Sequence, residues 1–203
     1  MPLPSLNCPS CGAMLELKYH HSKMVVCKYC GQTSYLNVDS IFTVGSPILL
    51  ADYGSVLSVG KIGKIKNKPF EVVGRLRFDY EDGFWDEWLL IMENEDEIWL
   101  QEDEGEFVLF RKKNLSDPPQ YISLVIGSIT TIYTDNVFLT EKNNAVINGG
   151  EGELPFQVVA GEKADYVDGI VVGKKLIASF EYMPEGVVYN VGEPLSMKDF
   201  LFT

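Results

Sequence analysis

The sequence contains little histidine and cysteine, and both are confined to its first part. The two histidines are His20 and His21, and the four cysteines are Cys8, Cys11, Cys27 and Cys30. Residues 31–203 therefore have neither the thiol nor the imidazole that cysteine-based or serine-histidine catalysis requires. No phosphate-binding glycine pattern is present, because GKIGKIKNK lacks the GK[ST] ending of a P-loop. These absences favour a protein that is not an enzyme.

Basic residues are also scarce, and long apolar runs are missing. The chain has 17 Lys and Arg against 29 Asp and Glu, which gives a net charge of −12 and disfavours a general nucleic-acid binder. No apolar run reaches the roughly 18 residues needed to cross a bilayer. The start of the chain lacks the charged, apolar and small-residue regions of a secretory signal. We therefore expect a cytoplasmic location.

The cysteines form two similar pairs, CPSCG at residues 8–12 and CKYCG at residues 27–31. Their C-x2-C-x15-C-x2-C spacing is typical of a tetrathiolate zinc site, and each pair is followed by a glycine that tolerates the left-handed backbone of a knuckle. Four thiolates fill a tetrahedral coordination sphere and leave no open position, so the site is structural. The sequence predicts a zinc ribbon over residues 1–33, with Zn²⁺ held by Cys8, Cys11, Cys27 and Cys30.

Two other states of the cysteines stay open at this point. Rubredoxin-type iron centres use the same paired knuckles, and the spacing does not separate iron from zinc. Disulfides are a further alternative, but a reducing compartment favours metal binding. The ribbon also raises the alternative of a nucleic-acid contact, although it carries only three lysines and no arginine.

Residues 34–203 are rich in short β-type runs such as FEVVGRLRF, WDEWLLIM and LIASFEY, separated by Gly, Asn-Gly and Asp-Gly. The pattern predicts an all-β domain, folded as an antiparallel sandwich or a partly open barrel. Residues 69–91 and 155–177 align without a gap and share ten of 23 residues, including P-F-x-V-V and D-Y-x-D-G. We therefore expect two related units, each a strand, an Asp-Gly turn and a returning strand.

The most acidic stretch lies in the first of these units. Residues 79–106 contain 13 acidic residues in 28 and no Lys or Arg. This pattern fits either a solvated sheet edge or an acidic and aromatic surface for a cationic partner. The candidate partner-binding residues are Trp85, Asp86, Glu87, Trp88 and Trp99. Acid-base catalysis of the glycosidase type by Glu87, Asp79 or Asp82 is an alternative of low specificity in so acidic a chain.

The order of these features resembles that of a bacterial family known as domain of unknown function 4178, fronted by a cysteine ribbon. The resemblance covers nearly the whole chain, and its most specific residues are Gly74, Arg75, residues 85–88, Trp99, Leu100, residues 152–155 and Glu181. It implies a bacterial accessory protein of the cytosol with no assigned reaction.

The sequence favours a non-catalytic adaptor, in which a zinc-stabilised ribbon is fused to an acidic β module that binds another protein. The alternative is a β domain that binds a small cationic ligand such as a polyamine, or acts as an enzyme, through the carboxylates of residues 79–106.

Overall fold

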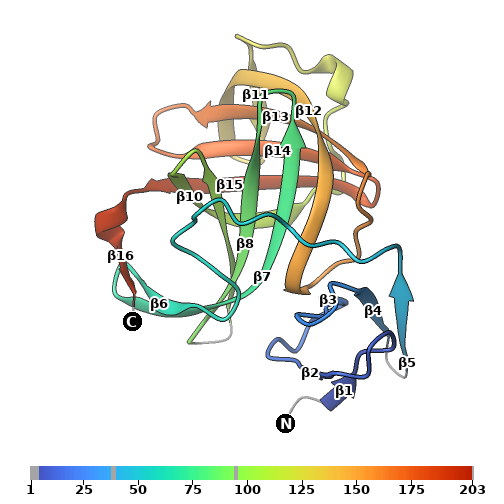
Figure 1. The fold of residues 1–203 in the computed structure, drawn as a ribbon. Helices are drawn as coiled ribbons and strands as arrows, with labels where there is room; N and C mark the ends of the chain where they lie inside the picture. Colours follow the sequence, from blue (N-terminus) through green and yellow to red (C-terminus); the bar gives the residue numbers. More distant parts are fainter. Residues whose placement is uncertain (1–4, 38–39, 94–95, 203) are drawn as a thin grey trace.

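The computed structural model describes residues 5–37, 40–93 and 96–202, which are built almost entirely from antiparallel β-strands (Figure 1). Its only helical segments there are two short 3-10 turns, η1 (Tyr121–Ser123) and η2 (Met197–Asp199). None of these described residues forms a helix with the length and apolar character needed to cross a membrane. The predicted all-β class is confirmed.

Eight of the strands close into a ring. Two four-stranded meanders supply them, and each strand pairs with the next in its meander. The first meander consists of β7 (Lys68–Tyr80), β8 (Gly83–Met92), β9 (Glu97–Asp103) and β10 (Glu106–Asn114). The second consists of β12 (Asp135–Leu154), β13 (Lys163–Val171), β14 (Ile177–Met183) and β15 (Gly186–Leu195). Pairing of β10 with β15 and of β7 with β12 joins the two meanders, so the ring is closed.

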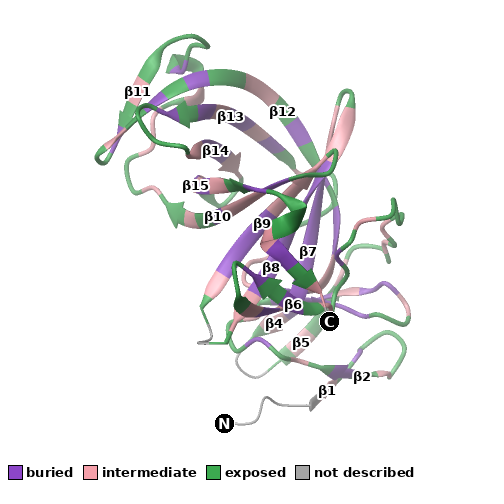
Figure 2. Ribbon diagram, turned by 90° about the vertical axis from the view of Figure 1, so that its left-hand side faces the viewer, coloured by how far each residue is buried: buried purple, intermediate pink, exposed green. Residues whose placement is uncertain are grey.

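Both faces of the first meander are buried along most of β7 and β8, as Figure 2 shows. Alternate side chains such as Trp85 and Trp99 point into the ring, where they meet residues of β12 and β13. The opposite face carries Trp88 and is covered by β6 (Ile62–Ile65), β16 (Phe200–Phe202) and the segment around Leu57. The sequence therefore lacks a simple alternation of polar and apolar residues here, because neither face meets solvent.

The outer face of the second meander is covered by the connection between the two meanders. This connection contains η1 and β11 (Ile129–Ile132), which pairs with β12. Leu124 from the connection is buried with Leu139 of β12 and Phe180 of β14. The chain thus uses its non-ring segments to cover both apolar outer faces of the ring.

The cysteine ribbon packs against one end of the ring. It contains β1 (Ser5–Asn7), β2 (Met14–Glu16), β3 (Met24–Val26), β4 (Thr33–Asn37) and β5 (Ser40–Val44), and its sheet extends past the boundary predicted at residue 33. Strand β3 pairs with the end of β12, with Met24 opposite Leu154. The ribbon residues Tyr19 and Tyr35 belong to the same buried cluster as the ring interior. The ribbon and the ring therefore share one core.

The two aligned sequence segments do not adopt equivalent structures, so the expected repeat of strand, Asp-Gly turn and strand is wrong for the second segment. In the first, Asp82 and Gly83 lie at the turn between β7 and β8. In the second, Asp168 and Gly169 lie inside β13. A Cβ atom at Gly169 would lie 2.5 Å from the carbonyl oxygen of Phe138, so this glycine serves close strand approach, not a turn.

Candidate functional site

The four predicted metal ligands come together at two knuckles of the ribbon. In each knuckle, a glycine amide donates a hydrogen bond to the carbonyl of the first cysteine, from Gly12 to Cys8 at 2.9 Å and from Gly31 to Cys27 at 2.8 Å. Gly12 has φ of +75° and Gly31 has φ of +69°, which are backbone conformations that favour glycine. The knuckle glycines are therefore required by the turn that aims both sulfurs of a pair in one direction.

The geometry of the four sulfurs fits a tetrahedral metal ion. All four Sγ atoms lie within 4.8 Å of one another, and none of the cysteines forms a disulfide. The Cys8 and Cys30 sulfurs are 3.7 Å apart, as are those of Cys11 and Cys27. Sulfurs at the corners of a tetrahedron with zinc-sulfur bonds of about 2.3 Å lie about 3.8 Å apart. These residues could therefore hold a metal ion, and such an ion would stabilise the ribbon without an open coordination position.

The predicted partner-binding residues do not form an exposed surface. Trp85, Asp86, Glu87, Trp88 and Trp99 have relative exposures of 6%, 3%, 1%, 1% and 2%. They are buried because the strands that carry them are covered on both faces. Their acidic members are paired with basic side chains from outside the acidic stretch, which the local sequence could not reveal.

Asp86 is paired with two arginines of β7. Its carboxylate accepts hydrogen bonds from Arg75 at 2.8 Å and from two nitrogens of Arg77 at 2.8 and 2.7 Å. The Arg75 guanidinium also lies 4.8 Å from the ring centroid of Trp88. Burial raises the pKa of Asp86 to about 6, although Arg75 acts in the opposite direction. This cluster has the geometry of a structural ion-pair network inside the fold.

The three carboxylates considered for acid-base catalysis are not brought together. Asp79 lies at the end of β7, where Asn148 donates a hydrogen bond to it, and Asp82 is exposed at the following turn. Glu87 lies inside the ring and is opposite Leu76 of β7 in the strand register. Glu87 is therefore not placed beside Asp79 or Asp82, and acid-base catalysis by these residues stays an alternative raised by the sequence alone.

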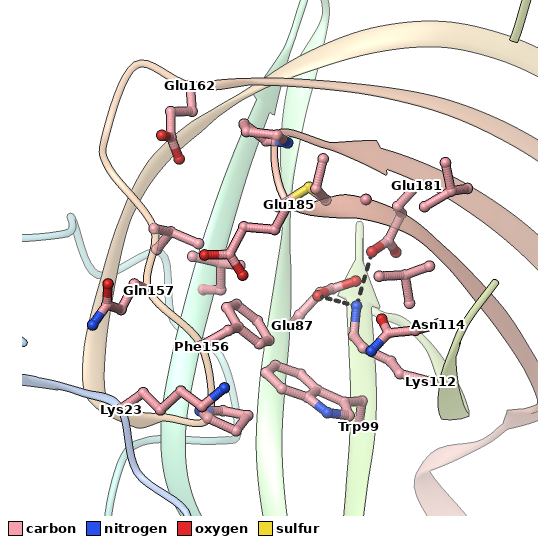
Figure 3. A pocket seen from close by; sticks show the side chains of 18 of the residues that line it. Lys23, Glu87, Trp99, Lys112, Asn114, Phe156, Gln157, Glu162, Glu181 and Glu185 are labelled. Atoms are coloured by element: carbon pink, nitrogen blue, oxygen red, sulfur yellow. Dashed lines mark hydrogen bonds and ion pairs between the residues drawn. The ribbon is translucent and has the colours of Figure 1, made fainter. Parts of the chain in front are cut away.

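Glu87 instead belongs to a buried cluster drawn from three strands of the ring. The ammonium of Lys112 on β10 lies 2.8 Å from Glu87 on β8 and 2.9 Å from Glu181 on β14. Asn190 of β15 donates a further hydrogen bond to Glu181. The cluster lines a pocket of about 550 Å³, shown in Figure 3. Nothing in the sequence indicated that Lys112 and Glu181 would meet Glu87, because they lie 25 and 94 residues from it along the chain.

The electrostatics of this cluster are unbalanced, with two carboxylates facing one ammonium. Burial and the charge of Glu181 raise the pKa of Glu87 to about 8, although Lys112 opposes this shift. Burial alone would lower the pKa of Lys112, but the two glutamates outweigh it and raise that pKa. At neutral pH the cluster therefore contains a protonated Glu87, a charged Lys112 and a paired Glu181.

Aromatic side chains form a wall of the pocket. Trp99 stacks on Phe156 with ring centroids 5.6 Å apart, and its indole nitrogen donates to Glu97 at 3.0 Å. The Lys112 ammonium lies 5.0 Å from the Trp99 ring centroid. Glu162 and Glu185 also line the pocket, and both are drawn above Phe156 in Figure 3. In total the lining contains five glutamates and two lysines, which leaves an excess of negative charge.

A second, smaller pocket of about 170 Å³ lies in the same ring interior and shares Glu181 with the first. Its carboxylates include Asp103 and Asp168. Burial and neighbouring carboxylates raise the pKa of Asp103 to about 6 and that of Asp168 to about 7. The ring interior is therefore acidic along both pockets.

Together these features define an all-β protein with a four-cysteine cluster that could hold a metal ion and an acidic, ligand-sized pocket in a closed ring of strands. The family model described as Domain of unknown function (DUF4178) matches residues 58–196, which include every strand of the ring. The chain belongs to this family. No curated protein and no solved structure was found to match the chain.

Proposed function

We propose that this protein is a non-catalytic accessory protein that binds a small organic cation in the 550 Å³ pocket of its ring. The observation that carries the proposal is the Glu87–Lys112–Glu181 cluster, in which one ammonium faces two buried carboxylates. A ligand ammonium beside Glu87 would replace the proton that this carboxyl holds at neutral pH.

The pocket also fits the remainder of such a ligand. Its volume lies within the roughly 300–1,000 Å³ common for small-molecule sites. The stacked rings of Trp99 and Phe156 offer an apolar surface for an alkyl chain and a face for cation–π contact. Glu162 and Glu185 add negative charge to the lining. A flexible amine of the polyamine type combines these requirements, since it carries several ammonium groups on an alkyl chain.

We further propose that the cysteine site holds structural zinc. The sulfur separations support a tetrahedral ion, and metal analysis of the purified protein separates zinc from iron. The expected result is one zinc and no iron for each chain. The protein-partner role favoured by the sequence stays a prediction, and a docking surface for it has to lie away from the buried residues 85–88.

Calorimetric titration with spermidine at moderate salt tests the ligand proposal. The wild-type protein should show saturable binding, and Glu87→Gln should weaken it by about tenfold or more, because glutamine keeps the shape of the protonated acid but cannot become an anion. Glu81→Gln is the matched control, since it makes the same side-chain replacement at a residue that is exposed at the β7–β8 turn. Equal affinities for wild type and Glu87→Gln, or heats that only reflect ionic strength, would refute the proposal.

A further inference from the structure

The ribbon segment between the two cysteine pairs is fixed to the ring by one buried carboxylate. Glu153 at the end of β12 is 5% exposed and accepts three hydrogen bonds from this segment. The donors are the amide of Lys18 at 2.8 Å, the amide of Tyr19 at 3.1 Å and the hydroxyl of Ser22 at 2.6 Å. Hydrogen bonds to a buried carboxylate are strong, so Glu153 fixes the position of the ribbon segment that supplies these three donors.

The same ribbon segment continues into the wall of the ligand pocket. The Tyr19 hydroxyl donates a hydrogen bond to one carboxylate oxygen of Glu97. The other oxygen of Glu97 accepts a hydrogen bond from the indole nitrogen of Trp99. Lys23 also lines the pocket, and Figure 3 draws its side chain below Phe156. The ribbon therefore positions the aromatic wall and also supplies part of the lining.

Residues 155–158 form the loop that carries Phe156, and the ribbon holds this loop at both ends. At its start, the amide of Lys23 donates to the carbonyl of Leu154 at 2.9 Å. At its end, the Tyr35 hydroxyl donates to the carbonyl of Val158 at 3.0 Å. Because the loop has no strand partner of its own, its position depends on these ribbon contacts.

The order of the ribbon depends in turn on its metal site. Its strands β1, β2 and β3 have three residues each, and two of the four fully buried members of its own apolar cluster are the ligands Cys8 and Cys27. Modules with so small a core rely on bound metal for folding. The ring has eight long strands and two apolar clusters that contain no ribbon residue, one around Trp88 and one around Phe180, so it does not share this dependence.

We propose that the ribbon is a wall of the ligand pocket, so that metal binding by the four cysteines and cation binding in the ring are thermodynamically coupled. This inference rests on the proposed function for its ligand. Loss of the metal releases Lys23 and Tyr35 from the pocket and Tyr19 from Glu97, which frees the Phe156 loop and weakens cation binding. Coupling is reciprocal, so a bound cation slows metal loss by stabilising the ordered ribbon.

The test compares zinc-loaded protein with protein stripped by a chelator under a thiol reductant, which keeps the cysteines reduced. Spermidine affinity should fall by about tenfold or more on zinc removal, within the usual range of coupling. Saturating spermidine should slow zinc release to a chromogenic chelator. Equal spermidine affinity for the two forms would overturn the inference while leaving the proposed function intact.

Hydrogen exchange measured without spermidine tests the link between the metal site and the pocket independently of the proposed function. Hydrogen exchange at the amides of residues 156–158 should accelerate on zinc removal, while β8 and β14 keep their protection. If spermidine does not bind the zinc-loaded protein, the proposed function fails and hydrogen exchange alone decides the coupling. Unchanged exchange at residues 156–158 would then overturn it.

Two substitutions loosen the ribbon without touching the cysteines. Glu153→Gln weakens the carboxylate that accepts three hydrogen bonds from the ribbon. Tyr35→Phe removes only the hydroxyl that donates to the Val158 carbonyl. Both variants should bind one zinc but bind spermidine more weakly, with Glu16→Gln as an exposed control in the ribbon. Tyr35→Phe keeps the test decisive if Glu153→Gln disturbs the ring strand. Wild-type spermidine affinity in Tyr35→Phe, with zinc bound, would count against the ribbon as a pocket wall.

Discussion

Replacing Glu87 with glutamine should remove a large part of the pH dependence of stability. Glu87 is 1% exposed and faces Glu181 across the shared ammonium of Lys112. Burial and the charge of Glu181 raise its pKa from the ordinary 4.5 to about 8 in the folded protein. The folded state therefore keeps a proton at neutral pH that the unfolded chain has already lost.

The sign and size of the effect follow from this difference in proton binding. Stability from the protonated Glu87 is fully present below the unfolded pKa of 4.5 and is lost as pH rises through the folded pKa of about 8. Each pH unit in this interval costs up to about 1.4 kcal/mol. Integrated from pH 6 to pH 8, the free energy of unfolding should fall by about 2 kcal/mol more in wild type than in Glu87→Gln. For a chain of this length the difference corresponds to about 4 to 8 °C in melting temperature.

The assay is urea unfolding of wild type, Glu87→Gln and the exposed control Glu81→Gln at several values between pH 6 and pH 8. The raised pKa values of Asp86, Asp103 and Asp168 contribute to all three proteins, so the comparison with wild type isolates Glu87. The control should follow the wild-type curve. Parallel curves for wild type and Glu87→Gln would contradict this prediction, because they would show that Glu87 titrates alike in the folded and unfolded chain.

Two further predictions concern the fold. Asp86→Asn leaves the buried guanidinium of Arg77 without its anion and should cost about 3 to 5 kcal/mol in urea unfolding, whereas Glu151→Gln, at a partly exposed pair, should cost under about 1 kcal/mol. Similar losses for both variants would contradict this account. Gly74→Ala would place a Cβ atom 1.9 Å from the Glu153 carbonyl where β7 meets β12. It should lower the free energy of unfolding by about 3 kcal/mol or more, and a near-neutral result would show that the seam can relax.

Local patterns were sufficient for the ribbon and for the fold class. The cysteine spacing predicted which four sulfurs meet, because a two-residue gap and a following glycine determine the knuckle over five residues. The β-type runs predicted the all-β class for the same reason, since strand formation depends on residues close in sequence. The aligned D-Y-x-D-G segments misled because the same glycine serves a turn at Gly83 and a close strand approach at Gly169.

The burial and the basic partners of the acidic stretch could not be predicted from its own residues. From sequence, residues 85–88 read as a charged surface because no basic residue lies within residues 79–106. Their basic partners come from elsewhere, with Arg75 and Arg77 preceding the stretch and Lys112 following it. Strand register and ring closure bring these side chains to the acids, and the covering segments exclude water from both faces.

Residue type and short-range spacing were enough to predict a four-cysteine cluster that could hold a metal ion, the β-strands and the excess of negative charge. The tertiary structure was needed to show that Glu87 and Lys112 lie inside a pocket, that Glu181 completes their cluster, and that the ribbon borders it. These residues are joined by pairings such as β10 with β15 and β7 with β12, which link distant parts of the chain. The charge of a side chain is thus given by its residue type, while its burial and its partner depend on which strands lie beside it.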